Sequence, residues 1–264
     1  MKVKNIELKG NKGAMKLEDT EVYFINSLRR IMLSELPKLA IDDVIIYDNT
    51  SPLFDEIITH RLGLIPIPTD LGALVFRDEC SCKGKGCPSC TVRFTLSKEE
   101  EGAVYSGDLQ PEHKSFAIKE DKIPIVNLSK DQRIILEVEA VLGRAKDHAK
   151  WQTVIAPSYT MDASVEIDKK QMDDVKEFLN ELPKDLVELK GNTLELKDIS
   201  KLPVLESYMN REKVDFITIT RDPTKITFKF ETDGSLNAKD ALQQSIDILK
   251  KKYDEFGKQL EKLK

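Results

Sequence analysis

One stretch of the chain, residues 20–68, places charged side chains inside strongly apolar patterns. Its first part predicts a helix over residues 20–36, which Thr20 can cap by accepting a bond from a free first-turn N–H group. Pro37 ends this helix, because the residue before a proline is driven out of the helical region. The apolar residues cover more than one narrow stripe, which is typical of a helix buried on several sides: Val22, Tyr23, Phe24, Ile25, Leu28, Ile31, Met32 and Leu36.

The second part of this stretch predicts a strand over residues 39–47 and a helix that begins at Pro52 and ends near Gly63. Thr50 or Ser51 can cap that helix. Two basic pairs stand beside these apolar residues, Arg29-Arg30 and His60-Arg61. A solvated helix edge would explain either pair alone, but together they favour a surface that contacts protein partners.

The four cysteines of the chain all lie between residues 80 and 90, in a C-x-C-x4-C-x2-C pattern. Four thiolates at such short spacing can surround one tetrahedral zinc ion, as a structural site with no open position for a substrate. Two disulfides, or four reduced thiols without a metal, are the alternatives. An iron–sulfur cluster has the right number of ligands but no spacing in its favour. The candidate ligands are Cys80, Cys82, Cys87 and Cys90.

The rest of the chain predicts short strands and two more helices. Trp151 fits a core anchor, and none of the three histidines has a partner at ligand or triad spacing. A helix is expected over residues 169–182. Strands are expected at residues 3–8, 14–17, 74–76, 91–96, 134–142 and 163–167, and as a hairpin of 214–220 and 225–232 across Arg221-Asp222-Pro223-Thr224.

The last predicted helix runs from about Asn237 to Leu263. Its apolar residues recur every 3.5 positions or so, the spacing of a seam that packs against another helix. A helix that caps the chain's own core is the alternative. The seam consists of Ala238, Leu242, Ser245, Leu249, Tyr253, Phe256, Leu260 and Leu263.

The run NSLRRIMLSELPKLAIDDV, followed by FDEIITHRLGLIPIP, resembles the D subunit of archaeal RNA polymerase. That family is similar to the third-largest subunit of eukaryotic RNA polymerase II and to the N-terminal domain of the bacterial alpha subunit. The cysteine-rich loop, Gly143 with His148-Ala149-Lys150-Trp151, and the C-terminal helix fit the same family. The resemblance covers nearly the whole chain.

The resemblance implies an α+β fold with an alpha-subunit-like dimerisation domain from residues 1–45 and 212–264. A mostly β inserted domain would span residues 46–160 and hold the cysteine-rich loop. Residues 161–211 would form a ferredoxin-like subdomain. Many relatives carry an iron–sulfur cluster there, but this chain has no cysteine after Cys90 and should lack one. The zinc loop of the eukaryotic relative favours zinc at the four cysteines.

The resemblance also implies a non-catalytic assembly-platform subunit of DNA-directed RNA polymerase. Such a chain pairs with subunit L and docks the large B subunit and the small subunits N and P. The residues expected to contact partners are Phe24, Leu28, Arg29, Arg30, His60, Arg61, Leu242, Leu249, Tyr253, Phe256 and Leu260.

Charge and motifs weigh against other functions. The net charge of -5 disfavours the alternative of a stand-alone zinc-ribbon nucleic-acid-binding protein, because such proteins are usually basic. No nucleophile elbow, phosphate loop or zinc-protease helix appears, so no catalytic residues are assigned. The N-terminus lacks the apolar core of a signal peptide, and no run approaches the ~18 apolar residues of a membrane span. A cytoplasmic location is therefore expected.

Overall fold

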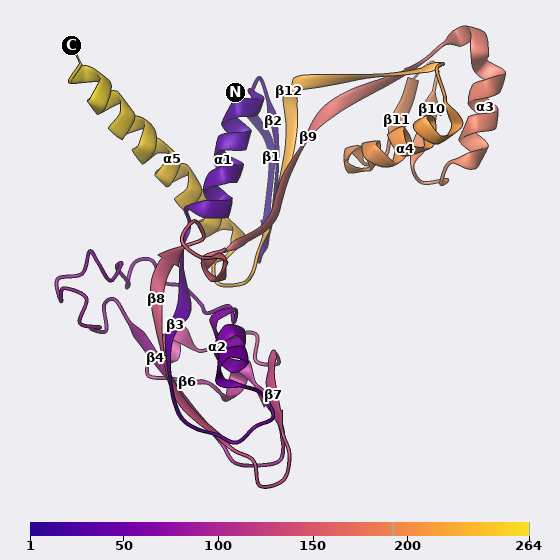
Figure 1. Ribbon diagram of the computed structural model, residues 1–264. Helices are drawn as coiled ribbons and strands as arrows, with labels where there is room; N and C mark the ends of the chain where they lie inside the picture. Colours follow the sequence, from indigo (N-terminus) through magenta and orange to yellow (C-terminus); the bar gives the residue numbers. More distant parts are fainter. Residues whose placement is uncertain (192, 264) are drawn as a thin grey trace. The chain divides into compact units, whose positions relative to one another are not determined.

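The computed structural model describes residues 1–191 and 193–263 (Figure 1). The fold is α+β, as the sequence predicts. Contacts among residues divide the chain into two units, each built from segments that are distant in sequence. Unit 1 consists of Met1–Glu7, Ala14–Asn26 and Ser158–Lys229, and unit 2 of Leu8–Gly13, Ser27–Pro157 and Phe230–Lys264.

Unit 1 contains most of a six-stranded sheet with the order β1-β2-β12-β9-β11-β10. Helices α3 (Met172–Glu181) and α4 (Leu202–Glu212) bury Phe178 and Leu205 in one cluster with Val165 of β9 and Leu194 of β11. The two helices therefore cover one face of the sheet (Figure 1). The strands are β1 (Lys2–Lys9), β2 (Lys12–Glu18), β9 (Val154–Ile167), β10 (Val187–Lys190), β11 (Thr193–Leu196) and β12 (Ile217–Thr232), with short 3-10 helices η4 (Lys169–Gln171) and η5 (Ile199–Lys201).

Unit 2 is built on a second sheet with the order β3-β8-β4-β6 and on a separate two-stranded pair, β5 and β7. Strands β3 and β8 pair antiparallel along almost their whole length, and Phe94 of β4 lies opposite Val138 of β8. Helix α2 (Asp55–Gly63) buries Ile58 and Leu62 in the same core. The strands are β3 (Pro37–Asn49), β4 (Val92–Lys98), β5 (Gly102–Tyr105), β6 (Gln110–Pro111), β7 (Pro124–Leu128) and β8 (Ile134–Arg144), with 3-10 helices η1 (Ser106–Asp108), η2 (Lys114–Phe116) and η3 (Ala149–Trp151).

Two long helices complete the chain. Helix α1 (Val22–Ser34) begins in unit 1 and continues into unit 2, and α5 (Ala238–Glu261) belongs to unit 2. The sequence predicts both helices and the strands β1, β2, β3, β4 and β8, and the structure confirms them with boundaries shifted by a few residues. Helix α5 begins at Asn237, whose side chain accepts a bond from the N–H of Asp240 at 2.8 Å.

The predicted helix caps are wrong. Helix α1 starts at Val22, so Thr20 lies one position before the cap. Helix α2 starts after Phe54, whose side chain makes no cap bond. The hydroxyl groups of the loop before α2 are already engaged elsewhere, since Ser51 Oγ donates to Asn49 Oδ1 at 2.6 Å and Thr50 Oγ1 accepts from the N–H of Arg133 at 2.8 Å.

The hairpin predicted at residues 214–232 is also wrong, because residues 217–232 form the single strand β12. A tight two-residue hairpin needs a residue with positive φ, and none of residues 221–224 has one. The side chain of Asp222 accepts bonds from the N–H and the hydroxyl of Thr224 at 3.0 and 2.6 Å. These bonds form within the strand and do not reverse the direction of the chain. Residues 74–76, predicted as a strand, have no regular structure.

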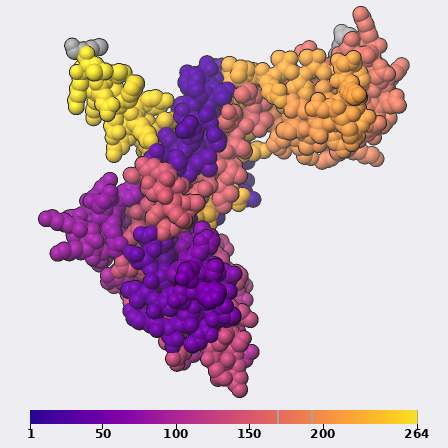
Figure 2. Space-filling view, viewed as in Figure 1, coloured from indigo at the N-terminus to yellow at the C-terminus, as the bar shows by residue number. Residues whose placement is uncertain are grey.

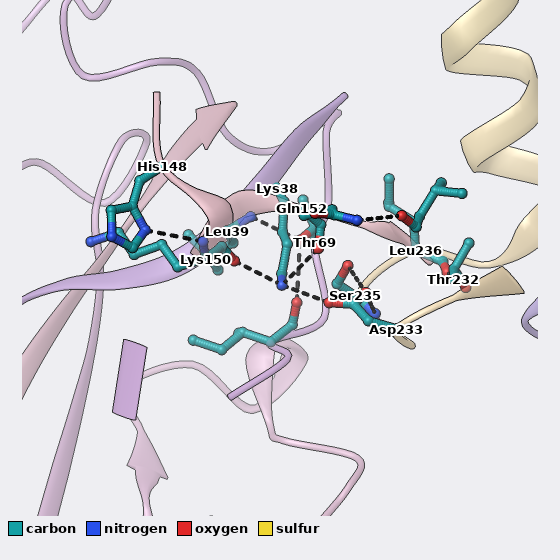
Figure 3. Close-up of polar contacts among 12 residues, drawn as sticks. Lys38, Leu39, Thr69, His148, Lys150, Gln152, Thr232, Asp233, Ser235 and Leu236 are labelled. Atoms are coloured by element: carbon teal, nitrogen blue, oxygen red, sulfur yellow. Dashed lines mark hydrogen bonds and ion pairs between the residues drawn. The ribbon is translucent and has the colours of Figure 1, made fainter. Parts of the chain in front are cut away.

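A buried lysine joins three segments of unit 2 (Figure 3). Lys38 in β3 is 3% exposed, and its Nζ lies 2.6 Å from a carboxylate oxygen of Asp233, just before α5. The same ammonium donates to the carbonyl oxygens of Lys150 and Gln152 at 2.9 and 3.3 Å. A buried charge is tolerated when it is paired and its donors are satisfied, which is the case here.

Trp151 packs against the backbone of β8. Its indole N–H donates to the carbonyl of Val141 at 3.2 Å, and the Nζ of Lys150 lies 4.4 Å from the ring centroid. A side chain at Gly143 would collide with the indole ring, so the close approach depends on glycine. Trp151 is half-buried and holds η3 on the sheet, consistent with its predicted role as an anchor.

Two glycine substitutions should have opposite effects on stability. We expect Gly143→Ala to destabilise the chain by about 1–3 kcal/mol, because the new methyl group displaces the Trp151 ring. Gly257→Ala should stabilise α5 by up to about 1 kcal/mol, since no atom of the described residues lies within 4 Å of the added carbon. Urea unfolding of both variants measures these changes. A Gly143→Ala chain as stable as wild type would contradict the packing described.

Candidate metal centre and partner surfaces

The four cysteines lie in a loop between α2 and β4 that projects from unit 2, purple in Figure 1. The N–H of Val75 donates to the carbonyl of Ser89 at 2.9 Å and closes the base of the loop. In the space-filling view the same segment forms a knob on the surface of unit 2 (Figure 2). The knob lies apart from the hydrophobic core of the unit, which centres on the sheet and α2.

Two tight turns fold the loop around the thiols. The N–H of Lys83 donates to the carbonyl of Cys80 at 2.9 Å, and the N–H groups of Cys90 and Thr91 both donate to the carbonyl of Cys87 at 2.9 Å. Gly84 and Gly86 have φ of +79° and +82°, a backbone conformation that residues with a side chain rarely adopt. Glycine at these two positions therefore lets the chain bring all four sulfurs together.

The sulfur atoms form one compact cluster. The Sγ–Sγ distances are 3.5 Å for Cys80–Cys87, 3.6 Å for Cys82–Cys90 and 3.9 Å for Cys87–Cys90, and all four Sγ atoms lie within 4.8 Å of one another. Metal–sulfur bonds of ~2.3 Å in a tetrahedron put the sulfurs about 3.8 Å apart. The donor set thus fits a single tetrahedral ion.

The same distances distinguish this arrangement from two disulfides and from an iron–sulfur cluster. A disulfide has a sulfur–sulfur bond of roughly 2.05 Å, and all four thiols are free. A cluster of several iron and sulfide ions would hold four thiolates farther apart than the ligands of one ion. The cysteines predicted as metal ligands are therefore the residues that the structure brings together as a possible metal site.

Backbone N–H groups favour the metal-binding thiolate form of two cysteines. A hydrogen bond from the N–H of Cys87 is the main cause that lowers the pKa of Cys82 to about 5. The N–H of Ser89 likewise lowers the pKa of Cys87. At Cys80 the N–H of Cys82 acts in the same direction, but hydrogen bonds with the thiols of Cys82 and Cys87, together with desolvation, raise the pKa to about 11. A bound cation would favour the thiolate form of all four cysteines.

A charge network ties this loop to the sheet. Arg77 donates to Glu139 of β8 at 2.6 Å and to Asp43 of β3 at 3.3 Å, and Arg93 of β4 also contacts Glu139, at 3.0 Å. Burial acts to raise the pKa of Glu139, but the hydrogen bonds from Arg77 and Arg93 outweigh it and hold that pKa below its usual value. Sequence reasoning missed Arg77, because its partner Glu139 lies 62 residues away.

The residues predicted to contact partners are spread over three helices, and several are buried in the chain itself. Leu28, Leu242 and Leu249 are 1%, 7% and 8% exposed. Phe24 and Arg29 of α1 are half-buried, while Arg30 is exposed. On α2 both His60 and Arg61 are exposed, and the guanidinium of Arg61 donates to the carbonyl of Ile125 in β7 at 2.6 Å.

The apolar seam of α5 changes from buried to exposed along the helix. Its first half, through Leu249, is buried, whereas Tyr253, Phe256 and Leu260 are 57%, 58% and 46% exposed. This second half extends beyond the rest of unit 2 (Figure 2). The Nζ of Lys252 contacts Glu35, after α1, at 2.8 Å and is the main cause that lowers the pKa of Glu35. The helix thus stays attached while its last turns present an apolar stripe.

Comparison with known proteins identifies similar chains. Residues 15–253 match the family described as the RNA polymerase Rpb3/Rpb11 dimerisation domain. The chain is 35% identical to the DNA-directed RNA polymerase subunit Rpo3 of Picrophilus torridus, over 97% of this chain and 98% of that protein. It is 38% identical to the protein of the same name from Methanosphaera stadtmanae, over 95% and 96%. It is 36% identical to the protein of that name from Thermoplasma volcanium, over 100% of this chain and 99% of that protein.

Among the described residues, no helix is long and apolar enough to cross a membrane.

Replacing one cysteine should release a bound metal and loosen only the loop. We expect wild-type chain to bind one tetrahedral ion and Cys87→Ser to lose it, with faster protease cleavage within residues 78–92. The rest of unit 2 should stay folded, because its core lies elsewhere. Elemental analysis and limited proteolysis of protein prepared without oxygen measure both effects, and Ser89→Ala is the matched control. Two disulfides and no metal in the wild-type sample would refute this expectation.

Proposed function

The chain belongs to the RNA polymerase Rpb3/Rpb11 dimerisation-domain family, and on this premise we propose that it is the Rpo3 subunit, also called the D subunit, of an archaeal DNA-directed RNA polymerase. Its role is to provide an assembly platform for DNA-templated transcription. It pairs with subunit L, and the pair docks the large B subunit and the small subunits N and P. The near-complete coverage of chain and relatives supports this role.

The observation that carries the proposal is the half-buried seam of α5. Tyr253, Phe256 and Leu260 continue the buried seam into solvent, where large apolar side chains are unfavourable unless a partner covers them. Burying one such side chain contributes roughly 1.5–3 kcal/mol. A second helix laid along this stripe would continue the same 3.5-residue spacing. Subunit L, the partner implied by the family, is our candidate for that helix.

Substitution of the exposed seam should weaken pairing with subunit L. We expect Phe256→Asp to weaken the affinity of the pair by about ten- to a hundredfold, since it removes one buried aromatic side chain and adds a charge. The control is Lys251→Glu, which is exposed on the same helix away from the seam. Co-purification and titration of each variant with subunit L measure the change. Unaltered affinity of Phe256→Asp would show that α5 is not the interface.

Leu249 is a poorer position for this test. Its side chain is 8% exposed within the single chain, so Leu249→Asp would bury a carboxylate before any partner binds. Loss of pairing in that variant would then reflect a damaged fold. The same holds for Leu28 and Leu242, which are also buried. Leu28, Leu242 and Leu249 pack inside the single chain. The proposed pairing surface consists of the exposed residues Tyr253, Phe256 and Leu260.

The arginines of α1 are proposed to dock the large B subunit. Arg30 is exposed, and a planar guanidinium can make paired hydrogen bonds with a carboxylate of another chain. We expect Arg30→Ala to leave pairing with subunit L unchanged and to weaken binding of the large B subunit to that pair by about three- to tenfold. Pull-down of this large subunit by the variant pair measures the change. Arg30→Lys should retain part of the binding, and full binding by Arg30→Ala would exclude the residue from the interface.

We propose zinc as the ion at the four cysteines. Zinc takes four thiolates in a closed tetrahedral site, and the observed Sγ–Sγ distances suit its bond length. Its role is to hold the loop in one shape, because four protein ligands leave no position for a substrate. The absence of cysteine after Cys90 leaves no thiolate set for an iron–sulfur cluster in the second half of the chain.

We further propose that the chain segment from β9 to β12 is the ferredoxin-like subdomain. Its elements follow the order β9-α3-β10-β11-α4-β12, and the sheet order β12-β9-β11-β10 supports this interpretation. We propose residues 1–45 with 212–264, residues 46–160 and residues 161–211 as the dimerisation, inserted and ferredoxin-like domains. In this division the ferredoxin-like sheet shares β12 with the dimerisation domain, and β9 begins in the inserted domain. Catalysis belongs to other subunits of the enzyme, and the chain works in the cytoplasm.

A further inference from the structure

A groove lies between strand β3 and helix α2 in unit 2. Its volume is about 320 Å³, near the lower end of ligand pockets of roughly 300–1,000 Å³. Residues 41–44 of β3 and residues of α2 line it, together with Leu64, His148 and Lys150. The groove shares no residue with the four-cysteine site or with the seam of α5.

The wall formed by β3 is a free sheet edge. Strand β3 is terminal in the order β3-β8-β4-β6, so within residues 1–191 and 193–263 no strand neighbours one side of its backbone. The ladder with β8 is irregular between Ile41 and Asp43 and again between Ile46 and Asp48. Residues 43–46 thus form a short regular edge between two bulges. Free N–H and C=O groups of such an edge can pair with an added strand.

The wall formed by α2 leaves room for such a strand. Thr59 and Gly63 face the groove one turn apart, and both are small. The Thr59 hydroxyl is folded back onto the carbonyl of Glu56 at 3.0 Å, which keeps it close to the helix. Ile57 and Leu64 nearby are 44% and 50% exposed, although α2 buries its other apolar residues.

The charge of the groove selects the occupant. Its ionisable lining consists of Asp42, Asp43, Glu56, His60, His148 and Lys150, and the Lys150 ammonium lies 2.5 Å from Asp42. Arg77 lies 3.3 Å from Asp43 but is shared with Glu139. A second copy of the chain would bring these carboxylates toward one another and be repelled. A segment that carries lysine or arginine would be attracted.

From this geometry we infer that the groove binds an extended, basic segment of another polymerase subunit, which adds a short strand to the free edge of β3. The added strand hydrogen-bonds the backbone groups of residues 43–46 that point away from β8, passes over Thr59 and Gly63, and places its basic side chains toward Glu56 and Asp43. This inference rests on the proposed function, because the occupant belongs to the assembled polymerase.

Hydrogen exchange of the chain in two purified states tests the inference. The first state is the chain paired with its dimerisation partner, and the second is the complete polymerase. We expect the amides of residues 43–46 that point away from β8 to exchange at least about tenfold more slowly in the polymerase, because an added strand protects edge amides. A photoreactive residue in place of Thr59 should cross-link, in the purified polymerase, to a segment rich in lysine or arginine.

A double substitution in the groove measures how much the groove contributes to the affinity for the remaining subunits. Glu56→Lys with Thr59→Lys fills the groove and reverses its charge, while lysine suits a helix and should leave α2 folded. We expect this double variant to reduce the affinity of the pair for the remaining subunits by roughly three- to tenfold. Glu100→Lys, exposed in the turn between β4 and β5, should not change it.

The results of these experiments distinguish failure of this inference from failure of the proposed function. Slower exchange together with a basic cross-linked segment supports the inference. Unchanged exchange at residues 43–46, or cross-links to an acidic segment, to nucleic acid or to a second copy, overturns it. A chain that fails to enter the polymerase at all would overturn the proposed function instead, and that result appears in the co-purification step before exchange is measured.

Discussion

The buried ammonium of Lys38 is the interaction on which the arrangement of unit 2 depends. It joins the first residues of β3, the carbonyls around η3 and the Asp233 carboxylate that precedes α5. Removal of one partner would leave an uncompensated buried charge, which costs roughly 3–5 kcal/mol. Further bonds surround the pair: Asp233 accepts from the N–H and hydroxyl of Ser235, and Thr232 Oγ1 donates to the carbonyl of Leu236 at 2.6 Å (Figure 3). These polar bonds fix the start of α5 to the sheet, in addition to the burial of Ala238, Ala241 and Leu242.

Because α5 is anchored, its exposed end is held in position to bind a partner helix. The helix is held at its first residue by Asn237 and near its middle by the contact between Lys252 and Glu35. Beyond that contact Tyr253, Phe256 and Leu260 are 57%, 58% and 46% exposed in the single chain. A rigid helix that presents an uncovered stripe has little conformational entropy to lose when a partner helix binds. The same anchoring would connect the pairing surface to the sheet and groove of unit 2, which suits a platform that joins several subunits.

The cysteine loop is held by a different kind of interaction. It has little apolar surface to bury, so its shape depends on the four sulfurs, on backbone turns at Gly84 and Gly86, and on the network of Arg77 with Glu139. A metal ion suits such a segment, because a few strong bonds replace a hydrophobic core. The loop can then differ in stability from the sheet that carries it.

The sequence by itself determined the helices α1 and α5, the main strands, the family resemblance and the set of four cysteines, because periodicity, spacing and composition are local properties. It failed at β12, where an Asp-Pro pair suggested a turn inside a continuous strand, and at the caps of α1 and α2. Helix α1 begins at Val22, and before α2 the hydroxyl groups of Thr50 and Ser51 bond to Arg133 and Asn49 instead. Only the tertiary structure decided which half of the α5 seam is exposed, that Lys38 meets Asp233, and that Arg77 meets Glu139. Each of these depends on residues far apart in the chain, and burial and pairing of that kind are set by packing rather than by local pattern.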